Sequence, residues 1–172
     1  MLLERTVLVM CWAFAILLIC FTTPQGKGRD AILIFLFKQL MTWIFGILVV
    51  QFGLINYPVR EFPNATNTSF SFEYFIYPAT CVTFVLRFPE EKSRLHQIGW
   101  YLFFPTWMTI LEVLIQKYTA LIDYIHWSWY WTWITLLVTF FISHRFYLWY
   151  TKHSSVTIGP DASQSPPKKS KG

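Results

Sequence analysis

The chain has 172 residues and a formal net charge of +5, and 55% of its residues are hydrophobic while 13% are charged. Charged residues make up about a quarter of an ordinary soluble domain, so this composition excludes a soluble globular protein and favours a helical membrane protein. The basic residues lie in short loops and a terminal tail and form no basic stripe, which excludes a nucleic-acid partner.

Five apolar stretches have the length that a helix needs to cross a bilayer, which is about 20 residues. In chain order they cover residues 6–23, 40–57, 70–88, 98–116 and 127–149. The first has no net positive charge before it and no small-residue cleavage site after it, so we expect a retained anchor and not a signal peptide. A shorter apolar run over 30–38 is expected either to lie in the membrane interface or to extend the second span.

Five spans place successive loops on alternating sides of the membrane. One side receives 11 of the 14 Lys and Arg residues, which predicts that this side is the cytoplasm, with the N-terminus outside and the C-terminus inside. These residues are Lys27, Arg29, Lys38, Arg87, Lys92, Arg94, Arg145, Lys152, Lys168, Lys169 and Lys171. The predicted fold is therefore all-α, a polytopic bundle over 1–153, followed by a disordered basic cytoplasmic tail over 154–172.

This orientation brings several polar residues to one depth, in the outer half of the membrane. An ionisable group inside a span is costly, so it usually faces the bundle and has a partner. Glu112, inside the fourth span, has two interpretations. It either forms a ligand, cation or proton site, or it is a buried carboxyl fixed by Arg60, by His126 or by a tyrosine hydroxyl.

The segment from Asp123 to Trp133 is unusually aromatic, with four Trp in the seven residues 127–133. It predicts either an aromatic cage that holds a cation or stacks a flat ligand, or an interfacial aromatic belt. If the helix starts early, Asp123, His126 and Tyr130 share one face. The candidate ligand-binding residues are Arg60, Glu73, Glu112, Asp123, His126, Trp127, Tyr130 and Trp131.

No sequence motif indicates catalysis, a metal or a cofactor. The chain lacks a nucleophile elbow, a phosphate-binding glycine loop and a zinc-protease helix. The acidic residues and His126 do not follow the local spacing of metal ligands. Three cysteines inside apolar stretches do not form a disulfide framework. Pro78 and Pro105 fall inside spans, where each frees a backbone carbonyl one turn earlier.

Several short motifs together resemble those of a family of small uncharacterised multi-pass membrane proteins from Bacillus-like and Clostridium-like Gram-positive bacteria. The motifs are Tyr57–Phe62, Thr68–Phe70, Phe72–Tyr74, Tyr77-Pro78, Glu112 with Tyr118-Thr119, and the block from Asp123 to Thr139 that contains Trp131–Thr135. The resemblance covers about residues 30–152. It implies a location in the bacterial plasma membrane and carries no known activity.

Three functions remain open from the sequence. The first is a non-enzymatic accessory protein or sensor with an outward-facing aromatic and acidic pocket, whose partners are the lipid bilayer and another membrane protein or a second copy of the chain. The second is a small oligomeric transporter or channel. The third is an intramembrane enzyme that uses Glu112 and His126 as acid and base.

Overall fold

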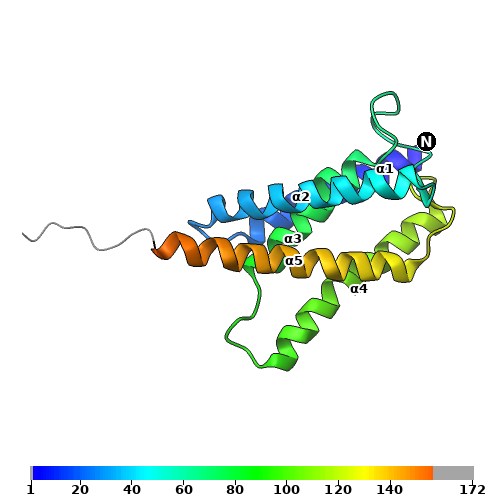
Figure 1. Ribbon diagram of the computed structural model, residues 1–172. Helices are drawn as coiled ribbons and strands as arrows, with labels where there is room; N and C mark the ends of the chain where they lie inside the picture. The colour runs from blue at the N-terminus through cyan, green and yellow to red at the C-terminus, as the bar shows by residue number, and fades with distance from the viewer. Residues whose placement is uncertain (1, 157–172) are drawn as a thin grey trace, which may run out of the picture.

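The computed structural model describes residues 2–156, which form an all-α bundle and confirm the predicted fold class (Figure 1). The helices are α1 (Leu2–Thr22), α2 (Gly28–Gln51), α3 (Tyr77–Leu86), α4 (Arg94–Tyr118) and α5 (Trp129–Val156). A π-helical segment, η1 (Ser71–Ile76), leads directly into α3. Two short strands, β1 (Ile55–Asn56) and β2 (Asp123–Tyr124), pair antiparallel.

Within the described residues, three helices are long and apolar enough to cross a membrane, namely α1, α2 and α4. The continuous helix of η1 and α3, Ser71–Leu86, is apolar but shorter. Helix α5 is 28 residues long. Its many hydroxyl-bearing and aromatic residues lower its mean hydropathy, and several of these hydroxyl groups face the interior of the bundle.

Most helix ends lie at two opposite ends of the bundle, whereas the connection 87–93 and the start of α4 project to one side (Figure 1). Arg87, at the start of this connection, donates to the Thr22 carbonyl at the end of α1. One end holds the start of α1, the connection 52–70 and the connection 119–128, whereas the connection 23–27 and the end of α5 lie at the other. We call these the strand end and the tail end. Helices α2 and α5 run antiparallel, and α4 diverges from α5 toward its own N-terminus.

Helix α2 begins and ends earlier than the second predicted span. The apolar run over 30–38 continues into it as one helix, so Lys38 lies inside the bundle and not in a loop on the cytoplasmic side. The helix stops at Gln51 because Gly53 adopts a left-handed conformation with φ +63°. The Gly53 amide then donates to Val50 and the Leu54 amide to Val49, which is the Schellman pattern of a glycine helix stop.

An early start of the last helix would have put Asp123, His126 and Tyr130 on one helix face. The structure instead places Asp123 in the strand pair, before the helix begins. Helix α5 starts at Trp129, because residues 123–126 bond to the chain that follows α2 instead. Asn56 pairs with Asp123, and the amides of Ile125 and His126 both donate to the Leu54 carbonyl. The helix runs on to Val156, and the remaining residues of the predicted tail, 157–172, lie outside the described residues.

The position of η1 follows from Pro78, which has no amide hydrogen. A proline at this place cannot donate to Glu73 or Tyr74, the carbonyls one π or α turn earlier. Both carbonyls instead accept from α2: the Thr42 hydroxyl donates to Glu73 at 2.6 Å, and the Gln39 amide donates to Tyr74 at 2.9 Å. The carbonyls to which Pro78 cannot donate therefore accept the hydrogen bonds that join η1 to α2.

We expect Thr42→Val to destabilise the protein by about 1 kcal/mol, since hydrogen bonds between membrane helices contribute about 0.6–1.7 kcal/mol. The substitution keeps the shape of the side chain and removes the donor to Glu73. Thermal unfolding in detergent measures the change. Thr6→Val is the matched control, because that hydroxyl bonds to Leu2 of its own helix at an exposed site. Equal effects of the two substitutions would contradict the role given to Thr42.

Candidate functional site

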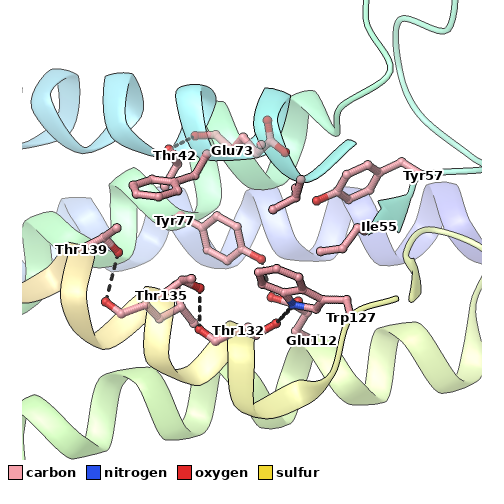
Figure 2. A pocket seen from close by; sticks show the side chains of 14 residues that line it. Thr42, Ile55, Tyr57, Glu73, Tyr77, Glu112, Trp127, Thr132, Thr135 and Thr139 are labelled. Atoms are coloured by element: carbon pink, nitrogen blue, oxygen red, sulfur yellow. Dashed lines mark hydrogen bonds between the residues drawn. The ribbon is translucent and has the colours of Figure 1, made fainter. Parts of the chain in front are cut away.

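A cavity of about 100 Å³ lies between α2, η1, α3, α4 and α5, in the half of the bundle nearer the strand end (Figure 2). We call it the acidic cavity, because Glu73 and Glu112 both line it. Its other lining residues are Thr42, Phe45, Gly46, Val49, Ile55, Tyr57, Tyr77, Trp127, Thr132, Thr135, Leu136 and Thr139. Figure 2 shows Glu73 on the α2 side and Glu112 on the opposite side, with the Tyr77 ring between them.

Glu112 is buried and its carboxyl group accepts three hydrogen bonds from hydroxyls. Tyr77 donates to Oε2 at 2.6 Å, while Tyr124 and Thr132 donate to Oε1 at 2.6 and 2.9 Å. Hydroxyl donors favour the charged form of a carboxyl group and offset the loss of hydration. The arrangement therefore fixes the carboxyl group in the wall of the cavity by three hydroxyl donors and without an ion-pair partner among the described residues.

Two neighbours hold these donors in position. Tyr124 comes from β2, and burial together with the Glu112 carboxylate raises the pKa of its hydroxyl well above the usual range, so the hydroxyl stays protonated and can donate. The Trp127 indole donates to the Thr132 hydroxyl at 2.8 Å, which leaves the hydroxyl hydrogen free to point at Glu112. The strand pair therefore fixes one donor, and the Trp127 indole orients another.

Glu73 has a different environment, although it is only 2% exposed. Among the described residues, neither of its carboxyl oxygens has a hydrogen-bond partner. The Tyr57 and Thr68 hydroxyls lie beside the carboxyl and favour its charged form, although neither makes a hydrogen bond of ordinary distance and angle. Buried polar atoms are nearly always paired, so an unpaired carboxyl beside a cavity indicates a place where a partner binds.

The Glu73 carboxyl lies directly against the backbone of α2 at Gly46. A methyl group at this glycine would overlap all three carboxyl atoms of Glu73. The glycine is therefore required by close approach, since no other side chain leaves room for the carboxyl between η1 and α2.

Lys38 lies just beyond the cavity on the tail side. It is fully buried, and its ammonium group donates to the Thr139 hydroxyl at 2.5 Å and lies 4.4 Å from the centre of the Phe140 ring. No carboxylate lies within ion-pair distance of it among the described residues. Because Thr139 lines the cavity, only the Thr139 hydroxyl separates the Lys38 ammonium group from the cavity.

Below Lys38 the bundle is closed by packed apolar side chains. Phe84 packs edge-to-face against Phe104 and Phe140, and these belong to a cluster that also contains Ile34 and Val82. Phe37 of α2 stacks on Phe146 of α5 with ring centres 3.9 Å apart. The acidic cavity thus ends at Lys38 and Thr139. Its rim includes Phe45, which is 41% exposed, and the half-buried Val49, Trp127 and Thr135.

The structure brings three of the eight candidate residues to the cavity, namely Glu73, Glu112 and Trp127. The other five lie elsewhere in the fold. Arg60 donates to the Tyr57 carbonyl and to Asn67, and Asp123 and His126 are exposed in the strand-end connection. Tyr130 and Trp131 are 45% and 47% exposed and contact each other. Of the partners expected for Glu112, the tyrosine hydroxyl is the one that forms.

The sequence analysis missed Lys38, Tyr77 and Tyr124, together with the hydroxyls of α5. Thr132, Thr135, Thr139 and Ser143 recur at three- and four-residue spacing, which is the signal of one polar helix face. Lys38 has apolar runs on both sides, so it would have stood out as an intramembrane charge if the second span had been started at Gly28.

Comparisons of the chain with known protein families, with curated proteins and with solved structures find no match. The resemblance to the Gram-positive membrane family therefore stays a prediction. Among the described residues, no group of three or more His, Cys, Asp or Glu side chains could hold a metal ion. The chemistry of the cavity is instead that of two carboxyls, several hydroxyls and aromatic rings.

We expect Gly46→Ala to destabilise the protein by about 1–3 kcal/mol, the usual cost of overpacking, because the added methyl group displaces the Glu73 carboxyl. Adding Glu73→Ala to this variant should restore part of the loss, since the overlap is then removed. Thermal unfolding of the single and double variants measures this coupling. Gly99→Ala is the matched control, as nothing lies within 4 Å of a methyl group there. Additive effects of Gly46→Ala and Glu73→Ala would contradict the contact.

Proposed function

We propose that this chain is a multi-pass protein of the bacterial plasma membrane and that its acidic cavity is an outward-facing site for a small organic ammonium ion. In this proposal the protein acts as a sensor or accessory component and not as an enzyme. The observation that carries the proposal is the Glu73 carboxyl, buried beside a cavity without a hydrogen-bond partner among the described residues.

The balance of charge around the cavity favours one added positive charge. Glu73 and Glu112 line the cavity, and Lys38 is the buried cation nearest to its floor. Charges away from water are costly unless they are balanced. If both carboxyls are ionised, they and one ammonium group leave one negative charge, which a singly charged cation would neutralise.

The walls of the cavity favour an organic cation over a bare metal ion. Tyr57, Tyr77, Trp127 and Phe45 supply aromatic faces around the two carboxyls. Aromatic rings attract ammonium groups and their methylated forms, and the attraction is stronger where water is excluded. A transition metal would need three or four converging ligands, which the described residues do not offer.

The closed core below Lys38 favours a sensor over a carrier. A transported ligand needs a route to the opposite side, but Phe84 and Phe140 are both 0% exposed at the tail side of the cavity. No second broken helix matches η1 among the described residues, whereas carriers often use a pair of them. The geometry does not support an enzyme that uses Glu112 and His126 together. The exposed His126 ring lies against the Gly53 carbonyl, whereas Glu112 is buried in the bundle.

The distribution of basic residues supports the proposed orientation. With Lys38 inside the bundle, the loops and helix termini at the tail end still carry Lys27, Arg29, Arg87, Lys92 and Arg94, with Arg145 and Lys152 in the last turns of α5. The strand end carries Arg5, Arg60 and Lys117. The positive-inside rule then puts the strand end, and the half of the bundle that holds the cavity, on the outer side. Lipid would cover the exposed apolar faces, and a membrane partner or a second copy would receive the signal.

Binding of tetramethylammonium tests the proposed site. We expect the purified protein in detergent to bind this cation and gain thermal stability with the logarithm of its concentration above the dissociation constant, whereas Glu73→Gln should lose at least tenfold in affinity. Asp123→Asn is the matched control, because that carboxyl is exposed and outside the cavity. Absence of saturable binding to the wild-type protein, or equal affinity of Glu73→Gln, would overturn the proposal.

Labelling of single cysteines tests the proposed orientation in intact cells. We expect a cysteine at Asn64, in an exposed connection at the strand end, to react with a membrane-impermeant maleimide, because that end faces outward. A cysteine at Glu91, in an exposed connection at the tail end, should react only after the cells are opened. Both variants require replacement of Cys11, Cys20 and Cys81. The reverse labelling pattern would mean that the cavity faces the cytoplasm.

A further inference from the structure

The two carboxyls of the acidic cavity differ in how the protein treats a negative charge. Glu112 receives three hydroxyl donors, so its charge is stabilised by groups that are already in place. Glu73 receives no hydrogen bond of ordinary geometry among the described residues, with only the weaker influence of the Tyr57 and Thr68 hydroxyls, and is pressed against the backbone of α2 at Gly46. A buried carboxylate without donors or an adjacent cation is unfavourable, and the least costly remedy is to bind a proton.

The charged and titratable groups that face Glu73 do not compensate a negative charge on its carboxyl. From α2 it meets Thr42 and Gly46, with Lys38 one helical turn further toward the tail end and bonded to Thr139. The connection before η1 contributes Tyr57 and Thr68, and α3 contributes Tyr77. Helix α4 contributes Glu112, whose negative charge opposes ionisation of Glu73, and the α5 residues that line the cavity are uncharged.

We propose that Glu73 carries a proton when the cavity is empty and releases it when an ammonium ion binds, so that the site exchanges one proton for one cation. This inference rests on the proposed function and adds its regulation. The O–H bond of the Glu73 carboxylic acid breaks, the proton passes to water, and the resulting carboxylate faces the cation. The total charge of the cavity is the same before and after.

The exchange makes ligand binding dependent on the external pH. A proton competes with the cation for one carboxyl, so the apparent affinity falls by about tenfold for each unit of pH below the point where Glu73 ionises in the empty protein. Above that point the affinity is constant. In the proposed orientation the released proton enters the medium outside the cell, and the sensor responds to the ratio of cation to proton there.

Proton release on titration with tetramethylammonium chloride tests the exchange in the full-length protein in detergent. This probe has no ionisable hydrogen, so every released proton comes from the protein. We expect about one proton per bound cation in a weakly buffered solution with a pH-sensitive dye, and none with sodium chloride at the same concentration. Calorimetry in two buffers that differ in ionisation enthalpy measures the same number independently.

Glu73→Gln should abolish the release, and Asp123→Asn should leave it unchanged. Saturable binding of the probe without proton release would overturn the exchange while leaving the proposed function standing, whereas absence of binding would overturn both. Infrared difference spectra of the wild-type protein provide a test that needs no variant. We expect addition of the probe to remove the carbonyl band of a protonated carboxylic acid, and persistence of that band with the probe bound would contradict the proposal.

Discussion

The missing amide hydrogen of Pro78 is the constraint on which the centre of this bundle depends. Its nitrogen cannot donate to the Glu73 or the Tyr74 carbonyl one turn earlier, and a buried carbonyl without a donor is costly. Thr42 and Gln39 of α2 supply both donors. The same π turn that exposes the carbonyls directs the Glu73 side chain toward α2, where Gly46 leaves room for it. One covalent feature thus sets the helix contact, the position of the carboxyl and one wall of the cavity.

The two halves of the bundle are built differently. Toward the tail end, α2 and α5 are held together by the contact of Lys38 with Thr139, by the stack of Phe37 on Phe146 and by the Tyr147 hydroxyl, which donates to Asp30 at 2.9 Å. Toward the strand end the cavity separates the same two helices. There the Glu112 carboxyl accepts hydroxyl donors from α3, β2 and α5, whereas the Glu73 carboxyl has no hydrogen-bond partner among the described residues.

The sequence predicted the features that depend on composition and period. The helical class, the buried position of Glu112 and the choice of Glu73 and Trp127 as candidates follow from apolar run length and from the cost of intramembrane charge. It could not predict features set by local backbone geometry, such as the stop at Gly53 or the strand pair that moves His126 away from Glu112. Lys38 was misplaced for the same reason, since its depth depends on where α2 begins.

The contacts that join α2 and α5 at the tail end have a mechanical consequence. A helix that is held more firmly toward one end tilts about that end when its other half is displaced. A ligand that draws Glu73 and the α5 hydroxyls together would tilt α5 about Lys38 and Thr139. The Phe37–Phe146 stack and the bond from Tyr147 to Asp30 lie beyond this point, so they would hold the tail-end segment of α5 and confine the tilt to the half that lines the cavity.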